Sequence, residues 1–485
     1  MGYYSLREWI EKLEAEKELK RVQAEVNWDL EIGGILRGVF DTGGPALLFE
    51  NIKDYKSTLC TRLFTGSLGT FSKVALMLGL PKDTPYVDLI RVWRERSKNR
   101  IKPVMVGTGP CKENILKGPD VDLFQFPVPH WSKLDGGRYI GTFHGVVTKD
   151  PETGWENSGV YRQVIHDKNS TSMSMAQGQH IWLHWRKYRK QGKNVPLAVA
   201  IGWDPVLPAV SAAPVPMGVD EWDVMGALRG EPVELVKCET VDLRVPASSE
   251  IVLEGEVLTD LSTFKNDGPF AEYPGYYGTK SQRPVFKVNC ITFRNNPIFQ
   301  GTITGKPITE DHRCGAISHS ALLWDLLDEA MTGVTGVNND PSTAYANVIV
   351  SVDNSYYGQV QQVAANIWGW MGSHQIGKNI IVCDSDINIY DLNEVFWALG
   401  YRMDPKRDLI QFPHWIHALD PIVHPQDKVL GAGGNMGTKL LIDATKPIEK
   451  PRSELLFGEK FAVVAYPDKD TMELVRRRWK EYGLV

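Results

Sequence analysis

One stretch of the chain, residues 157–272, brings together side chains that could bind a metal ion and transfer a proton. They are an asparagine, an arginine, a histidine and three acids, each close to glycine, proline or aromatic residues. The six residues are Asn157, Arg162, His180, Glu221, Asp267 and Glu272. We interpret them as two sites that share one cavity, a metal-phosphate clamp and an arginine-carboxylate acid group.

The first of these sites would consist of Asn157, His180 and Glu221. An amide oxygen, a histidine nitrogen and a carboxylate can hold Mg²⁺ or Mn²⁺ and leave positions open for a phosphate oxygen. Each residue also has a purely structural explanation, as a turn residue, a polar residue at a helix start and a solvated acid in a first helical turn. The spacing alone leaves both explanations open.

The second site centres on Asp267 and Glu272, which stand five residues apart across a Gly-Pro turn and precede an aromatic segment, residues 273–277. A rigid turn beside aromatic rings can partly desolvate an acid and favour its protonated form. An arginine such as Arg162 would favour ionisation of one acid, so the other could carry the proton. The alternative is a solvated loop with ordinary acids.

Two other motifs are weaker. The glycine-rich segment 430–437 resembles a dinucleotide-binding loop, but Met436 takes a glycine position and no strand-to-helix unit surrounds it. His414, His417 and His424 lie near one another without the fourth ligand of a structural zinc site. We expect these histidines to serve in the core or in a pocket wall.

The elements that would position the two sites follow from apolar periodicity. Between residues 139 and 307, β-branched residues occupy alternate positions and glycine, proline and asparagine bound the runs. Strands are expected at 139–147, 197–202, 249–254 and 285–293, and helices at 180–189 and 221–229. This pattern favours a barrel-like or sandwich-like β domain with inserted helices.

Mixed patterns flank the β-rich region, so the expected fold class is α+β with several domains. Before it, an amphipathic opening helix at 6–19 and a helix at 70–78 indicate a small α/β lobe. After it, a connecting helix leads to a βαβ domain and an amphipathic terminal helix. We expect this connector at 318–331, strands at 346–352 and 379–383, and helices at 358–370, 392–399 and 470–482. The predicted domains are 1–110, 111–316, 317–334 and 335–485.

Bulk properties exclude several classes. The 485 residues exceed what one core usually supports, and the formal charge of −5 without a Lys/Arg run gives no reason to expect nucleic acid. The six cysteines stand singly, which suits a reducing cytoplasm, and the apolar runs are too short to span a bilayer. We therefore predict a cytoplasmic protein that acts on a small molecule.

Seven segments, taken in order, resemble the UbiD-like decarboxylases. These are reversible aromatic and α,β-unsaturated acid decarboxylases that use prenylated FMN. The resemblance is collinear from the first helix to segment 439–445. The seven segments are 157–162, 179–182, 218–221, 234–238, 246–255, 267–272 and 306–312.

The resemblance implies a fold, a cofactor and a set of site residues. The implied fold is a split β-barrel flavin-binding domain joined by a helix to an α/β C-terminal oligomerisation domain. Asn157, His180 and Glu221 fall at the family's Mn²⁺ ligands, with the metal bridging to the cofactor phosphate and K⁺ as a further candidate ion. The residues that match the flavin lining are Ser158, Gly159, Val160, Tyr161, Arg162 and Gln179.

The resemblance also implies a reaction, a reversible non-oxidative decarboxylation through covalent attachment of the substrate to prenylated FMN. Arg162 would orient the substrate carboxylate, and Glu272 would donate the proton that replaces CO₂. Asp267 stands where many members have glutamate, and the lysine that some members place before Asn379 has no clear counterpart. Candidates for the pocket wall are Cys314, Gly315, Phe412, His414 and Trp415.

The implied partners are a small aromatic, heteroaromatic or unsaturated acid, CO₂, and a flavin prenyltransferase that supplies the cofactor. The assembly implied is a homodimer or a homohexamer. Two alternatives stay open from the sequence. The chain could be a subunit or scaffold of a multi-subunit carboxylase, or an ordinary FMN oxidoreductase.

Overall fold

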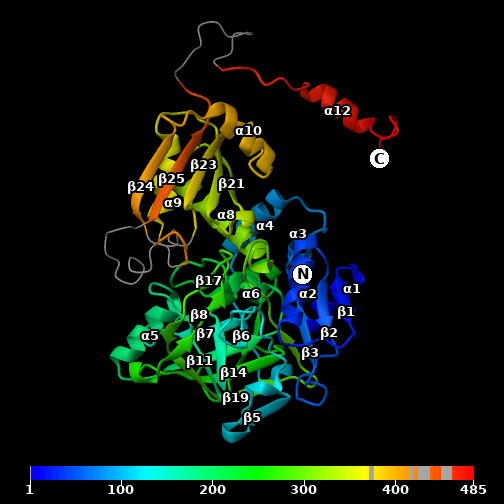
Figure 1. The fold of residues 1–485 in the computed structure, drawn as a ribbon, viewed down its shortest axis with the longest axis vertical. Helices are drawn as coiled ribbons and strands as arrows, with labels where there is room; N and C mark the ends of the chain where they lie inside the picture. The colour runs from blue at the N-terminus through cyan, green and yellow to red at the C-terminus, as the bar shows by residue number, and fades with distance from the viewer. Residues whose placement is uncertain (1, 371–375, 416–418, 424–436, 449–460, 485) are drawn as a thin grey trace.

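The computed structural model describes residues 2–370, 376–415, 419–423, 437–448 and 461–484. Figure 1 shows the N-terminal lobe and the central β region in the lower part of the molecule and a C-terminal α/β layer above them. Helix α8 (Glu310–Ala330) lies where these parts meet. In the described parts of the chain, no helix combines the length and the apolar character needed to cross a membrane.

The N-terminal lobe packs its helices beside a four-stranded sheet in the order β1-β2-β3-β20. Its last strand, β20 (Ile298–Gln300), comes from the end of the central region and pairs with β3 in parallel, so the lobe and the central region share a sheet. The other elements are α1 (Leu6–Ala15), β1 (Leu19–Val22), α2 (Glu31–Thr42), β2 (Ala46–Phe49), β3 (Arg62–Thr65), α3 (Phe71–Met77) and α4 (Tyr86–Lys98).

The central region is built on a nine-stranded sheet in the order β6-β9-β10-β19-β14-β11-β7-β8, with β5 also paired to β19. The long strands β11, β14 and β19 are almost entirely buried and form its middle. The bounds are β5 (Asn114–Lys117), β6 (Tyr139–Gly141), β7 (Gly145–Lys149), β8 (Glu156–Gly159), β9 (Gln163–Asp167), β10 (Ser170–Ser172), β11 (Val195–Ile201), β14 (Ile251–Val257) and β19 (Val285–Phe293).

Two short connections require this sheet to curl. Strands β6 and β7 lie towards opposite ends of the strand order, yet only residues 142–144 separate them; β8 and β9 are likewise apart, and only residues 160–162 separate them. Because a residue spans at most about 3.5 Å, the two ends of the sheet must lie close together. The sheet is therefore a barrel with an open seam, and the single strand expected over 139–147 is corrected to two strands on either side of it.

Helices and smaller sheets surround the barrel. Helix α5 extends at the side of the sheet opposite the N-terminal lobe in Figure 1. The remaining central elements are β4 (Val104–Met105), α5 (His180–Lys190), α6 (Val206–Ser211), α7 (Glu221–Arg229), β12 (Glu234–Lys237), β13 (Arg244–Pro246), β15 (Lys265–Asp267), β16 (Phe270–Ala271), β17 (Tyr277–Gly278) and β18 (Ser281–Arg283).

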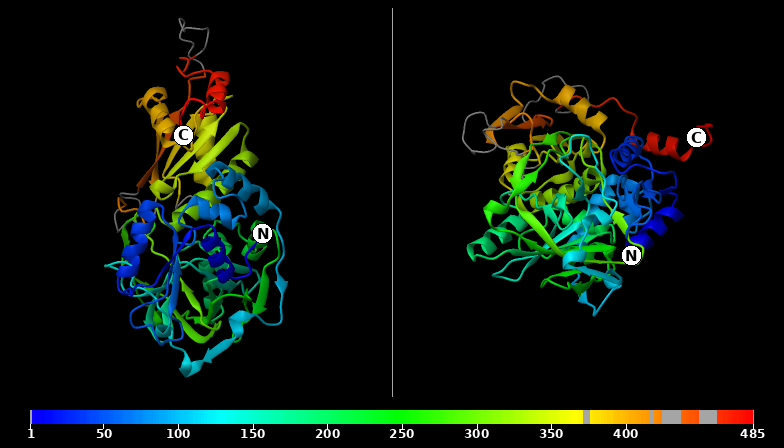
Figure 2. Two further views of the ribbon diagram at one scale, coloured as in Figure 1. Left: turned by 90° about the vertical axis from the view of Figure 1, so that its right-hand side faces the viewer. Right: turned by 60° about the horizontal axis from the view of Figure 1, so that its bottom comes forward.

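The C-terminal layer is a five-stranded sheet in the order β21-β22-β23-β25-β24. Its three inner strands are parallel and its two edge strands are antiparallel to them. Helix α12 reaches away from the body of the molecule, as the right-hand view in Figure 2 also shows. The bounds are β21 (Val334–Asn339), β22 (Asn347–Val352), α9 (Gln359–Gly369), β23 (Asn379–Asp384), α10 (Leu392–Arg402), β24 (Leu409–Trp415), β25 (Gly437–Ala444) and α12 (Lys469–Arg477).

The helices expected beside the two candidate sites are confirmed as α5 and α7. The connecting helix is also confirmed, but it begins at Glu310 instead of residue 318. Its start is a capping box in which Thr309 and His312 satisfy each other's backbone N–H groups. The sequence pattern for such a box has Glu or Gln at this position, so a histidine conceals it.

Candidate active site

Asn157, His180 and Glu221 come together in the folded chain. The Asn157 amide donates from Nδ2 to Glu221 Oε1 over 2.8 Å, and the same nitrogen lies 3.4 Å from His180 Nδ1. His180 Nδ1 is 3.9 Å from Glu221 Oε1. Asn157 and Glu221 are buried, whereas the His180 side chain is 14% exposed. The cluster can therefore be reached from the side of His180.

Two helix starts deliver these side chains. His180 is the first residue of α5 and Glu221 is the first residue of α7, while Asn157 lies on β8 at the end of the sheet. Gln179, the residue before α5, accepts a hydrogen bond from the Ala176 amide at 2.7 Å. The N-terminus of each helix carries partial positive charge, which favours an anion such as a phosphate beside the cluster. In α7 the amides of Trp222 and Asp223 already donate to Asp220, at 3.2 Å and 3.0 Å.

The donor set fits a hard divalent cation. Asn157 Oδ1 accepts from the Tyr161 hydroxyl at 3.1 Å, so a half-turn of the amide would direct Oδ1 at His180 and Glu221 and let Nδ2 donate to Tyr161 Oη. Within the described residues, no group of three or more His, Cys, Asp or Glu side chains is arranged for a metal. A site here would therefore use the asparagine as its third protein ligand.

The seam segment between β8 and β9 is held from behind by α6. Ser158 Oγ lies 2.8 Å from Ser211 Oγ, and the Val160 amide donates to the Ser211 carbonyl at 3.1 Å. A Cβ on Gly159 would lie 2.5 Å from the Tyr161 ring, so only glycine lets this ring fold back over the strand. The segment thus presents its backbone at the seam in a fixed path.

Arg162 ends the same segment and joins both acids of the second site. Its Nε and Nη2 lie 2.8 Å and 2.6 Å from Asp267 Oδ1, and its Nη1 contacts Glu272 Oε1. Its guanidinium carbon stands 5.2 Å from the centre of the Phe270 ring. The second predicted cluster is therefore also assembled, with the arginine between two carboxylates.

The two acids have different surroundings. Asp267 is completely buried, and Ser172 Oγ and Tyr139 Oη donate to it in addition to Arg162. The Glu272 side chain is 15% exposed. The three side chains named here all donate hydrogen bonds to Asp267, and a carboxylate that only accepts hydrogen bonds matches them. Glu272 is the more exposed acid, so it is the one that can exchange a proton with its surroundings.

Sequence reasoning missed Asp135, Tyr139 and Ser172, which surround the acid turn. Burial raises the pKa of the Asp135 carboxyl to about 6, and the pKa of the Tyr139 hydroxyl is also raised by burial. The only local signal was the turn sequence Asp135-Gly-Gly137. Nothing in the sequence links that turn to residues 267–272.

The residues proposed for the pocket wall lie in different places. Phe412 is 53% exposed and stacks on Trp368 with ring centres 5.6 Å apart. Cys314 is buried in α8, and a Cβ on Gly315 would lie 2.3 Å from the Tyr345 hydroxyl. Because close neighbours cover Cys314 and Gly315, their predicted role in the pocket wall is corrected to a role in packing α8. The side chains of His414 and Trp415, together with His417, His424 and residues 430–436, lie outside the described residues.

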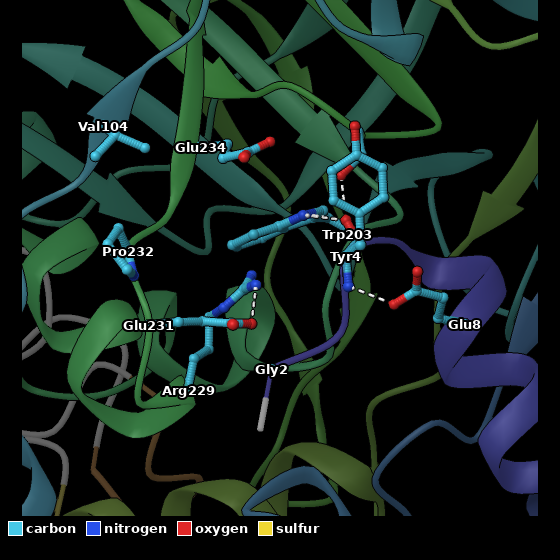
Figure 3. A pocket seen from close by; sticks show the side chains of 10 residues that line it. Gly2, Tyr4, Glu8, Val104, Trp203, Arg229, Glu231, Pro232 and Glu234 are labelled. Atoms are coloured by element: carbon cyan, nitrogen blue, oxygen red, sulfur yellow. Dashed lines mark hydrogen bonds and ion pairs between the residues drawn. The ribbon is translucent and has the colours of Figure 1, made fainter.

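A separate cavity of about 440 Å³ opens between the start of the chain and α7 (Figure 3). Arg229 stacks on Trp203 and pairs with Glu231 in its wall. This cavity shares no residue with either cluster. It therefore gives no support to a function at either of the two clusters.

Comparisons with known proteins match the chain throughout. Residues 10–93, 102–307 and 312–444 match the N-terminal, Rift-related and C-terminal domain models of 3-octaprenyl-4-hydroxybenzoate carboxy-lyase. The pyrrole-2-carboxylic acid decarboxylase of Pseudomonas aeruginosa is 32% identical over 495 residues, which cover 98% of each chain.

Solved structures agree. The vanillic acid decarboxylase of Sedimentibacter hydroxybenzoicus in its closed form matches with a TM-score of 0.86 at 32% identity over 99% of each chain. An evolved dimeric form of the UbiD-class enzyme HmfF from Pelotomaculum thermopropionicum, in complex with prFMN, matches with a TM-score of 0.81 at 28% identity, covering 98% of this chain and all of that one. Fold and comparisons together define a carboxy-lyase. The chain belongs to the UbiD family.

Proposed function

We propose that the protein catalyses the reversible, non-oxidative decarboxylation of an aromatic, heteroaromatic or α,β-unsaturated acid with prenylated FMN and Mn²⁺. The observation that carries the proposal is Arg162 held between Asp267 and Glu272, five residues after Asn157 on one segment. Relatives named as decarboxylases of pyrrole-2-carboxylic, vanillic and 3,4-dihydroxybenzoic acids support the substrate class.

The first cluster would hold the cofactor through its phosphate. Asn157, His180 and Glu221 would bind Mn²⁺, and the N-termini of α5 and α7 would add N–H donors for the phosphate oxygens. The seam residues 158–162 and Gln179 would line the flavin. Prenylated FMN, when bound, supplies the electron sink for the electron pair left on the substrate carbon when CO₂ leaves.

The second cluster would orient the substrate and supply the proton. When Glu272 carries a proton, its neutral carboxyl releases Arg162 Nη1, and the guanidinium edge can bind the substrate carboxylate with two hydrogen bonds. Asp267 stays paired with Nε and Nη2 and keeps the guanidinium in place. As the bond to CO₂ breaks, Glu272 gives its proton to the carbon that carried the carboxylate.

The test is co-expression with a flavin prenyltransferase, followed by a panel of aromatic and unsaturated acids. We expect CO₂ release and exchange of the product hydrogen with deuterium at the same carbon for at least one acid. Loaded protein that performs neither reaction on the panel would overturn the proposal. Mass and absorption spectra of the extracted cofactor distinguish prenylated FMN from the unmodified FMN of an oxidoreductase.

We also propose a homo-oligomer in which α12 packs against a second copy. No residue of α12 is buried, and Leu474, Trp479 and Tyr482 are each more than 40% exposed near it. Deleting residues 461–485 should lower the mass measured by light scattering. An unchanged mass contradicts this role for α12. Co-purification of a second, different chain would favour a multi-subunit enzyme, as in the complex of the vanillic acid decarboxylase.

A further inference from the structure

The acid turn that carries Glu272 is held by a loop of the barrel, residues 130–137. The Ala271 amide donates to Asp135 Oδ1 at 2.9 Å, and the Gly136 amide donates to the Pro269 carbonyl at 2.7 Å. A Cβ on Gly136 would lie 2.4 Å from the Gly268 carbonyl oxygen, so the two backbones are in direct contact. The loop therefore touches the residue immediately before Glu272.

The residue after Glu272 is held from the other side. His312, fully buried in the first turn of α8, lies with Nε2 at 2.7 Å from the Tyr273 carbonyl oxygen. A carbonyl can only accept, so Nε2 carries the hydrogen, and Nδ1 accepts from the Thr309 amide at 3.0 Å. One tautomer thus serves both the helix cap and the acid turn.

From these contacts we infer that Asp135 and His312 are positioning residues for Glu272, fixing the backbone on both sides of it. Asp135 accepts two amide hydrogen bonds, from Ala271 and from Ser132 at 3.1 Å, and is 8% exposed. The inference rests on the proposed role of Glu272 as proton donor. Displacing a reacting group by about 1 Å can cost about a hundredfold in rate, so such fixation is significant for catalysis.

The contacts of Asp135 depend on its charge. An ionised carboxylate accepts charge-assisted hydrogen bonds from the amides, whereas a protonated carboxyl is a weaker acceptor and adds a hydroxyl donor on one oxygen. Burial raises the pKa of Asp135 to about 6; the hydrogen bonds from the Ala271 and Ser132 amides oppose that rise, as do the charges of His130 and Arg162. Tyr139 is the other titratable group facing it. The hold on Ala271 should therefore be strongest well above pH 6 and weaken as the pH falls through about 6.

The effect of Asp135 on stability has the opposite sign. Because the pKa in the folded protein is raised above its ordinary value, the fold binds this proton more tightly than the unfolded chain does. The contribution of Asp135 to stability is present at low pH and is lost as pH rises through about 6. A neutral residue here should consequently not lower the unfolding temperature at pH 8, whereas a purely structural role would lower it.

The first experiment uses hydrogen exchange on the cofactor-free protein. In Asp135→Asn, amide exchange in residues 268–278 should rise about tenfold, the change in equilibrium constant that about 1.4 kcal/mol produces. Asp204→Asn is the matched control, because Asp204 is also buried and accepts from two amides, those of Tyr3 and Val206. Equal exchange in Asp135→Asn and the wild type would overturn the inference.

His312 offers a paired comparison. His312→Gln keeps a donor near the position of Nε2, and His312→Asn keeps only a group near Nδ1. Exchange in residues 268–278 should rise in the asparagine variant and stay near the wild-type rate in the glutamine variant. The reverse order would count against the role of the Tyr273 contact. If a variant fails to fold, the wild type itself tests the inference. The protection of its amides in residues 268–278 against exchange must fall when the pH is lowered from 7.5 to 5.5.

Kinetics of the loaded enzyme separate this inference from the proposed function. Asp135→Asn should lower kcat about tenfold to a hundredfold and leave KM within about twofold of the wild-type value. The decrease of kcat that the wild type shows when the pH falls through about 6 should be absent from this variant. Unchanged kcat together with faster exchange would refute positioning and leave the proposed function intact. A wild type without turnover would refute the proposed function, while the exchange data would still decide whether Asp135 holds the turn.

Discussion

Glu272→Gln should abolish most of the turnover of the loaded enzyme while leaving its cofactor in place. The amide keeps the size of the side chain and can still contact Arg162 Nη1, but it cannot donate a proton to carbon. General acid catalysis typically contributes about 10² to 10⁴ in rate, so kcat should fall by that factor. Stopped-flow CO₂ release and product hydrogen exchange measure it, and both should fall together because they share the proton transfer.

The control for this variant is Glu256→Gln, the same change at a partly exposed glutamate on β14 that pairs with Asn194. It should leave kcat within about twofold of the wild type, as expected for a surface position. Retained decarboxylation in Glu272→Gln would remove Glu272 from the acid role. Loss of the flavin from that variant would instead indicate that Glu272 supports the cofactor site, which contradicts the division of roles between the clusters.

Local sequence signals sufficed for elements whose ends are defined nearby. Helix α7 has the bounds that were predicted for it, and both of its ends are defined locally: Asp220 caps its first turn, and Gly230 ends it in a left-handed conformation. The strand predicted over 139–147 failed because apolar alternation continues across residues 142–144, where the chain crosses the seam. Periodicity reports that a segment is extended, and it carries no information about which strands become neighbours.

The same limit applies to the site. Residue types and turns suggested two groups among Asn157, Arg162, His180, Glu221, Asp267 and Glu272 but left purely structural explanations open, and the family resemblance gave each group a role. The fold supplies the physical reason for that grouping, because residues 160–162 cross the seam and place Arg162, beside β9, on the other side of it from Asn157 on β8. Asp135 could not be found from sequence, since its contact with Ala271 spans 136 residues.

Glu221→Ala should eliminate metal and flavin binding without unfolding the protein. Glu221 would contribute the one formal negative charge among the three proposed ligands, and its loss also leaves the Ser158 amide, 2.9 Å from Oε2, without its acceptor. The purified variant should contain less than about a tenth of the manganese and flavin of the wild type, measured by mass spectrometry and absorbance. Changes to residues around a bound metal typically lower its affinity by about tenfold or more.

A binding measurement on cofactor-free protein makes this prediction independent of turnover. A ligand at a hundred times its Kd stabilises the folded state by about 2.7 kcal/mol, so MnCl₂ should raise the unfolding temperature of the wild type and leave that of Glu221→Ala unchanged. Asp223→Asn is the control, because Asp223 lies in the same helical turn but pairs with Lys102 at 2.6 Å. It should respond to manganese like the wild type. If Glu221→Ala retains full metal and flavin, the phosphate must be anchored elsewhere, and the helix N-termini alone would have to hold it.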